Sequence, residues 1–298
     1  MIFRIRAQNV SGMSGLLGAP VGCYRRHVDI VALVSLATPV EVEAPLLAAD
    51  LGCTAYEAAL LLRAPSPVPL LRTAERARAV DLLAKLRARG HDAVACDAAA
   101  VVSSEAMTQV RSFVLEPDAL VVTTGHAAPP SGHVASDRCA WTDVIAFIRA
   151  VHRTRSESVD KSTSQKFDLG RAALSGGIMV TKKVTTTTKH ASDEREPVLY
   201  IFRRNGPPLL FQQSRTRYEA LGPDLRPSQL ENFATLVRVF RERAPRAPCD
   251  ERLLAPRPGN DRIRAGANGA VSSSTSDGVD LLAHLVAMAV SRTTPYRS

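Results

Sequence analysis

The sequence predicts an α+β protein with two modules, and three observations carry that prediction. Short β-branched and apolar runs indicate strands at 28–36, 68–72, 91–97 and 197–204. Stretches with apolar residues every three or four positions, several with capping residues, indicate helices between them. After residue 104 the pattern changes from helix-rich to strand-rich, which places a module boundary there.

The chain of 298 residues therefore divides into four segments. We expect a flexible extension at 1–22, an α+β module at 23–99, and a β-rich, barrel-like module ending in a helix at 105–245. The remaining segment, 246–298, is rich in Pro, Ala, Arg, Gly and Ser, and we expect it to be mostly disordered.

The first module reads as strand, helix, helix, strand, helix, strand. Pro39 opens the first helix and Gly52 ends it, with an apolar face of Val42, Leu46, Leu47 and Ala49. Thr54 and Glu57 form a capping box at the second helix.

The third helix of this module is expected to begin at Thr73 as its cap and to end at Gly90. Its predicted apolar stripe is Val80, Leu83 and Leu86. A closing strand follows at 91–97.

These residues resemble the C-terminal domain of the bacterial ribosomal stalk protein over about a quarter of the chain. The resemblance implies the same fold, whereas the lysines that this family uses to contact elongation factors are replaced here by Tyr56, Ala59 and Leu60. The matching positions are Leu51, Gly52, Glu57, Ala58, Ala64, Pro65, Pro67, Val68, Ala79, Leu82, Leu86 and Gly90.

The second module is predicted from turn signals and alternating apolar residues. A hairpin is expected at 110–123, and a second one at 197–214 around Asn205-Gly206. Residues 141–153 fit a strand or a helix, and the polar stretch 154–195 contains a possible strand at 184–190. Ser228 caps a final helix whose apolar stripe is Leu230, Phe233, Leu236, Val237 and Phe240.

This order of strands with one C-terminal helix loosely resembles a bacterial pleckstrin-homology-like domain, which implies an antiparallel barrel. The resemblance is carried by Phe113, Leu115, Asp118, Leu120, Trp141, Asp143 and Val144.

One piece of the tail has a different character. Residues 278–292 follow Asp277 as a cap and are apolar at Leu281, Leu285, Met288 and Ala289. Two alternatives stay open: a helix that docks on a partner or on this protein's own body, and a helix-forming stretch that arises by chance in an Ala-rich tail.

The candidate catalytic and ligand-binding motifs do not have the required residues at the required spacing. Lys182 and Lys183 come too late after Gly177 for a phosphate-binding loop, and Cys139 near His133 has no orienting residue. The cysteines contain no C-x-x-C pair and read as reduced thiols, and no run of residues is long and apolar enough to span a bilayer. We therefore expect no catalytic residue, no cofactor, no metal and no transmembrane segment.

The net charge of +9 permits weak binding to an anionic surface. The candidate binding residues are Lys182, Lys183, Lys189, Arg203 and Arg204, if they share one face of the second module. A nucleic-acid partner is not favoured, because the aromatic residues are too few for a stacking platform on single strands.

The sequence thus favours a non-enzymatic cytoplasmic protein that binds an unknown protein or peptide and acts as a regulatory or interaction module. The alternatives are a peripheral binder of anionic lipid or another anionic ligand, and an enzyme whose site has no recognisable motif.

Overall fold

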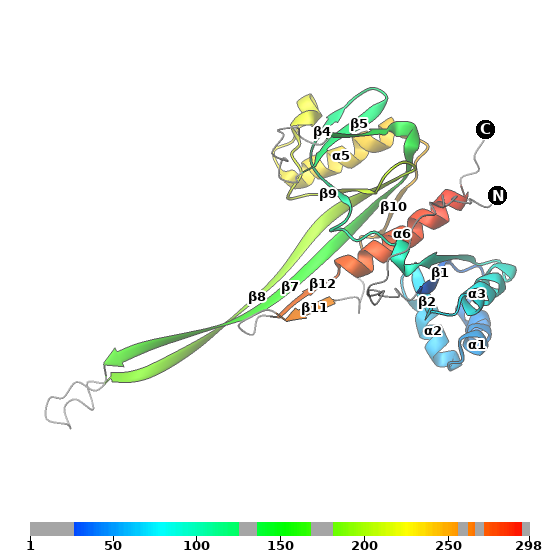
Figure 1. Ribbon diagram of the computed structural model, residues 1–298, viewed down its shortest axis with the longest axis horizontal. Coiled ribbons are helices and arrows are strands. Elements are labelled where there is room, and N and C mark those ends of the chain that lie inside the picture. Colours follow the sequence, from blue (N-terminus) through cyan, green and yellow to red (C-terminus); the bar gives the residue numbers. More distant parts are fainter. Residues whose placement is uncertain (1–26, 125–135, 168–180, 256–261, 266–270, 294–298) are drawn as a thin grey trace, which may run out of the picture.

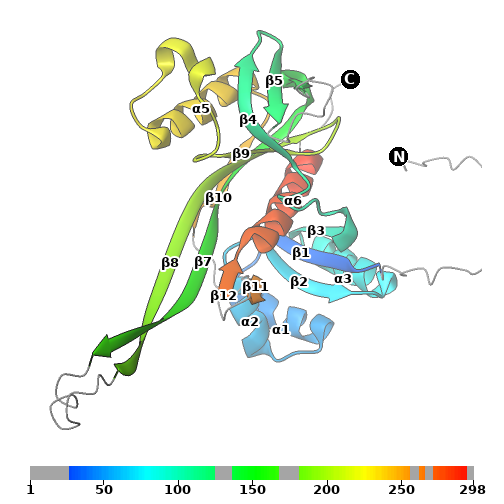
Figure 2. The same cartoon turned by 60° about the vertical axis from the view of Figure 1, so that its left-hand side comes forward.

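The computed structural model describes residues 27–124, 136–167, 181–255, 262–265 and 271–293. At 124, 156–167, 181–191, 262–265, 271–272 and 293 the description extends to the backbone only. Five layers stack in space: helices α1–α3, a small sheet, helix α6, a large sheet and helix α5 (Figure 1). A long two-stranded ribbon projects from these layers (Figures 1 and 2).

The small sheet has three antiparallel strands in the order β2-β1-β3. They are β1 (Asp29–Ser35), β2 (Val68–Thr73) and β3 (Asp92–Asp97), as the sequence predicts. Because side chains alternate along a strand, β1 contributes to two cores. Val31 and Leu33 pack against α1–α3, and Ile30, Ala32 and Val34 face α6.

Helices α1 (Val40–Leu51) and α2 (Ala55–Arg63) join the first two strands. Gly52 ends α1 with a positive φ of 73°, and the capping box of Thr54 and Glu57 starts α2, so both predictions are confirmed. Of the predicted apolar face of α1, Leu47 is buried as expected, whereas Val42, Leu46 and Ala49 are exposed. The buried face also contains Glu43, Ala44 and Ala48.

Helix α3 (Arg76–Ala88) leads into β3 and ends beside Gly90, whose φ is 86°. Thr73 is not its cap, since β2 continues through Thr73 and the helix starts after Glu75. Of the predicted stripe, Leu86 is buried and Leu83 is partly buried, whereas Val80 is exposed. Ala79 and Leu82 complete the buried face.

The large sheet follows the order β11-β12-β7-β8-β9-β4-β5-β6, and β10 pairs with β7. The predicted hairpin is β4 (Thr108–Leu115) and β5 (Ala119–Thr124), and β6 (Ser136–Ala140) adds to it. Residues 141–153 form a 3₁₀ turn, η2 (Trp141–Asp143), followed by strand and not helix. The remaining short strands are β9 (Leu209–Gln212), β10 (Cys249–Leu253), β11 (Arg262–Ala265) and β12 (Val271–Ser274).

Two long strands dominate this sheet. Strand β7 (Val144–Phe167) pairs with β8 (Thr181–Arg203) from Val144 and Arg203 to Phe167 and Thr181. The described parts of the polar stretch, 154–167 and 181–195, are therefore strand, although their sequence lacks the apolar alternation of a half-buried strand. The strand predicted at 184–190 is confirmed as part of β8.

The two faces of the large sheet carry different helices. One face packs on α5 (Gln229–Arg243), whose predicted capping box at Ser228 and Glu231 is confirmed. Its apolar stripe is buried except for Leu230, which is 63% exposed. The short turn η3 (Glu219–Asp224) adds Leu221 to this core.

The other face packs on α6 (Ser276–Thr293), which contains the segment 278–292 that the sequence sets apart from the rest of the tail as a helix. Leu282, Leu285 and Val286 are buried between the two sheets. Of the alternatives for 278–292, the structure shows docking on the protein's own body. Since one apolar cluster joins both sheets, two separately packed modules are not confirmed.

Barrel closure is not confirmed either, because β11 and β6 end a linear strand order and do not pair with each other. Among the described helices, none has by itself the length and apolarity to cross a bilayer. Helices α1 and α2 meet those criteria only when taken as a pair, and they are bent by 116°.

Candidate functional site

A groove opens at the N-terminal side of the molecule, where α2 meets the edge strand β2. It has a volume of about 550 Å³. The small sheet ends at β2 on this side, and α2 covers only part of the apolar wall that results. Its lining is Leu51, Cys53, Glu57, Leu60, Leu61, Ala64, Leu70 and Leu71.

Glu57 is the one charged residue in the lining of this groove. Its Oε2 accepts hydrogen bonds from the backbone N–H of Thr54 at 2.9 Å and from Thr54 Oγ1 at 2.8 Å. Both hydrogen bonds lower the pKa of the Glu57 carboxyl, and the bond from the Thr54 backbone has the larger effect. The groove therefore presents apolar walls with a single fixed negative charge.

Large apolar side chains are exposed on α1 and α2, and one of them, Leu60, lines the groove. Tyr56 is 70% exposed and Leu60 is 51% exposed, and they lie four residues apart on one face of α2. Val42 and Leu46 have the same spacing on α1 and are also exposed. Clusters of exposed apolar residues on a folded protein mark interaction sites more often than isolated ones do.

The basic residues predicted to bind an anion do not form one cluster. The Arg203 guanidinium is buried and makes two hydrogen bonds to the Asp137 carboxylate, one of them at 2.9 Å from Nη1 to Oδ1. A third bond runs from Arg203 Nε to the Pro207 carbonyl, so this side chain holds the 203–207 turn. Arg204 is exposed at the same end of β8.

Lys182, Lys183 and Lys189 lie in the far part of β8, where the backbone alone is described. Between Lys189 and Arg203 the strand rises by roughly 45 Å at about 3.3 Å per residue. The lysines and the two arginines therefore cannot belong to a single small site.

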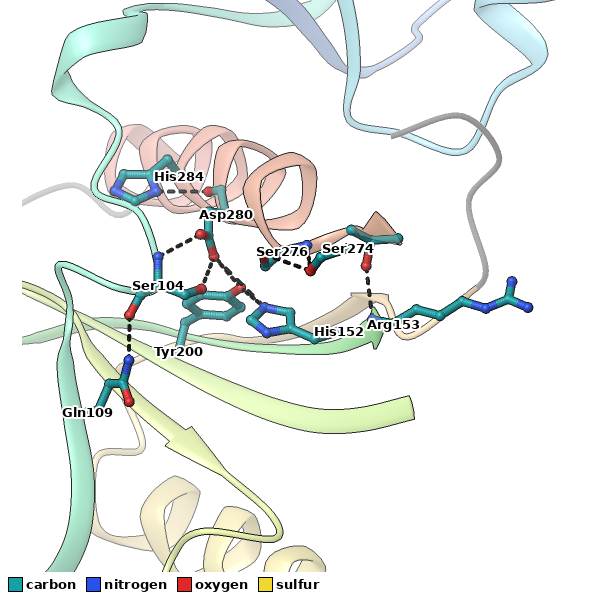
Figure 3. A network of polar contacts seen from close by, with 10 residues as sticks. Ser104, Gln109, His152, Arg153, Tyr200, Ser274, Ser276, Asp280 and His284 are labelled. Carbon is teal, nitrogen blue, oxygen red and sulfur yellow. Dashed lines mark hydrogen bonds and ion pairs between the residues drawn. The ribbon is translucent and has the colours of Figure 1, made fainter. Parts of the chain in front are cut away.

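A buried polar network lies between α6 and the large sheet (Figure 3). Asp280 is 1% exposed and is its centre. The Asp280 carboxyl accepts from the Ser104 backbone N–H at 2.6 Å, from Ser104 Oγ and from Tyr200 Oη at 2.7 Å. His152 Nε2 lies 2.6 Å from Tyr200 Oη. Since that hydroxyl already donates to Asp280, Nε2 is the donor.

His284 extends the network along α6. Its Nε2 accepts from the Val102 backbone N–H at 3.2 Å, so Nδ1 carries the proton and donates to the Asp280 carbonyl at 2.8 Å. Burial lowers the pKa of His152 and of His284, and burial raises the pKa of Tyr200. Both imidazoles are therefore held neutral at pH 7.

This network contains residue types found in active sites, but its geometry is that of a structural tie. Ser104 Oγ donates to a carboxyl group and not to a histidine, so no nucleophile is activated. Ser104, His152, Tyr200 and Asp280 are all buried. The network fixes the connection at 98–107 against α6 and β8.

The other chemical candidates are placed as follows. Cys139 is buried, which raises the pKa of its thiol and disfavours the reactive thiolate. His133, Gly177 and the extension 1–22 lie outside the described residues. Across the described parts of the chain, no three His, Cys, Asp or Glu side chains are grouped as metal ligands.

Sequence reasoning missed the groove and the network for different reasons. The groove required the correct helix register, which places Leu60 outside, and Leu60 was noted only as a departure from the stalk pattern. The network joins residues separated by 48, 80 and 176 positions, which no local pattern reveals.

Comparison with known proteins identifies no relative of this chain. No protein-family model matches the chain, no curated protein matches it, and no solved structure matches it.

Proposed function

We propose that the protein is a non-catalytic binding protein and that the groove on α2 receives an apolar segment of a partner protein. The single observation that carries the proposal is the half-exposed Leu60 on the wall of an apolar groove. Exposure of such an apolar surface to water is unfavourable, and its burial by a partner is favourable.

The charge of the groove defines the chemistry of the partner segment. Its walls are apolar and its one lining charge is Glu57, so the complementary ligand is an amphipathic segment with apolar side chains and one lysine or arginine. Tyr56, one turn before Leu60, provides the kind of aromatic contact that often dominates protein interfaces.

The thiols support a reducing compartment as the place of action. The four cysteines in the described residues, Cys53, Cys96, Cys139 and Cys249, are all unbridged. A cytoplasmic location is part of the proposal for this reason.

The test uses a random peptide library displayed on phage and selected against the full chain. Selected peptides are synthesised, and their affinity is measured by fluorescence anisotropy for the wild type, Leu60→Lys and Glu57→Gln. We expect selection of apolar peptides with a basic residue. Burial of a leucine contributes about 1.5 to 3 kcal/mol, so Leu60→Lys should weaken binding by a factor on the order of ten to a hundred.

Leu230→Lys is the matched control, because Leu230 is a leucine of similar exposure on α5. It should change affinity by less than about twofold. Glu57→Gln should weaken the peptides by about two- to fivefold, the range of an exposed ion pair. Equal effects of Leu60→Lys and Leu230→Lys would contradict the proposal, as would selected peptides without apolar residues.

A further inference from the structure

The outer part of the β7–β8 ribbon, residues 158–167 and 181–190, forms an arm. Its ten paired positions run from Ser158 and His190 to Phe167 and Thr181. In the described structure these backbones pair only with each other, since β12 reaches β7 no further than Glu157. At about 3.3 Å per residue the arm is roughly 33 Å long, and it points away from the layers (Figure 2).

The root of the arm is fixed to the body. β12 pairs with β7 from Thr154 to Glu157. On the opposite strand, Asp193 accepts two hydrogen bonds from the Arg153 guanidinium, from Nε and from Nη2, each at 2.6 Å. A planar bidentate pair at this point holds the two strands in register where the arm begins.

The sequence of the arm is cationic and rich in hydroxyl residues. It contains one carboxylate, Asp160, and five lysines: Lys161, Lys166, Lys182, Lys183 and Lys189. Lys182 and Lys183 are adjacent positions of β8, and adjacent positions of a strand belong to opposite faces. The cationic positions are therefore distributed over both faces of the ribbon.

A partner that lies on one side of the arm would match only half of these positions. The major groove of a nucleic-acid duplex has phosphates on both sides and admits a two-stranded ribbon. The length of the arm is comparable to one helical turn of the duplex, about 34 Å. Serine and threonine hydroxyls, here including the run 185–188, also donate to phosphates.

We propose that the arm binds duplex DNA in its major groove, through phosphate contacts made by its lysines. The few aromatic residues disfavour binding of single-stranded nucleic acid, but binding in the major groove of a duplex does not require stacking on aromatic side chains. An anionic membrane is the weaker match, because the arm contains only Val159, Val184 and Phe167 as apolar residues and a membrane-bound element needs an apolar face.

The test measures binding of the full chain to a fluorescent duplex of about 20 base pairs, roughly two helical turns. Five phosphate contacts predict that affinity falls by a factor on the order of 10² to 10³ between about 50 and 200 mM salt. Replacement of the five arm lysines by glutamine should weaken binding at low salt at least about 100-fold and flatten the salt dependence.

A charge-matched control replaces five exposed arginines of the body by glutamine: Arg76, Arg215, Arg217, Arg241 and Arg243. It lowers the net charge equally and should weaken binding by less than about fivefold. Fluorescence of Trp141 and the unfolding midpoint should match the wild type in the arm variant, because the arm lies beyond the last residue of β7 that pairs with β12, Glu157, and its strands pair with each other.

Three outcomes would overturn the proposal. They are equal losses in the two variants, no binding of the wild type at low salt, and binding to vesicles with about 30% phosphatidylserine in place of the duplex. These results are independent of the α2 groove, so either proposal can fail without the other.

Discussion

The Ser104 backbone N–H donates a hydrogen bond to Asp280 Oδ2 at 2.6 Å, across 176 positions of the sequence. Ser104 lies in the connection between the two sheets, and Asp280 lies in the helix that both sheets bury. This bond therefore ties the connection between the two sheets to α6, the helix that both sheets cover.

Asp280→Asn should destabilise the protein by about 3 kcal/mol. An amide presents a donor to a site that contains three donors, so at least one buried polar group loses its partner. Asp277→Asn, an exposed position on the same helix, should cost less than about 1 kcal/mol. Urea unfolding measures both, and equal costs would show that the network contributes nothing specific.

Stability should fall as the pH drops below 6.5. Burial lowers the pKa of His152 and His284 from the ordinary value of 6.5, so the unfolded chain takes up protons at a higher pH than the folded chain. The contribution of both residues is complete above pH 6.5 and is lost toward their lower folded values. Urea midpoints between pH 7.5 and about 5 test this; a flat profile contradicts it.

Leu285→Ala should cost about 2 to 5 kcal/mol, because Leu285 is fully buried between the two sheets. Leu230→Ala, at an exposed position, should cost less than about 0.5 kcal/mol. Trp141, the single tryptophan, reports on the core beneath α5, while circular dichroism reports on all helices. Both signals should shift together, and unfolding of one sheet without the other would show that α6 does not couple them.

Gly206→Ala should be more harmful than Gly52→Ala, although both glycines have positive φ. A Cβ at Gly206 would lie 2.8 Å from Arg203 Nη2, whereas a Cβ at Gly52 meets no atom within 4 Å. We expect about 1 kcal/mol for Gly52→Ala from backbone strain alone, and about 2 to 3 kcal/mol for Gly206→Ala. Thermal unfolding compares them, and equal midpoints would contradict the close approach to Arg203.

Local signals predicted the elements of the first module well. The capping box of Thr54 and Glu57 and the left-handed ends at Gly52 and Gly90 are encoded within a few residues, and the structure confirms each. The helix faces were predicted only in part: Leu47 and Leu86 are buried, whereas Val42 and Val80 are exposed. Both faces of these helices contain aliphatic residues, and only tertiary packing selects one.

In the second module, sequence patterns predicted some of the strands and not others. The strands at 197–204 and 208–214 were predictable because burial on both faces makes them continuously apolar. Of the ribbon within 154–195, only the strand at 184–190 was predicted, from its β-branched residues. The rest was not, because a projecting strand needs no apolar alternation. Helix α6 was assigned to a tail because most of the residues it packs against, in β1, β3, β7 and β8, lie far from it in the sequence.

The candidate site was only partly visible in the sequence. Arg203 resembled a surface cation, and only its ion pair with Asp137, 66 positions away, shows that it is structural. Tyr56 and Leu60 were visible as departures from a lysine-bearing helix, but their exposure depends on how α2 packs.

Hydrogen–deuterium exchange of the full chain, with and without a selected peptide, tests the central claim most directly. We predict slower exchange in α2 (Ala55–Arg63) and at the edge strand β2 (Val68–Thr73), with unchanged exchange in α5. Protection confined to α5, α6 or the arm, or the same protection in Leu60→Lys as in the wild type, would contradict a binding groove on α2.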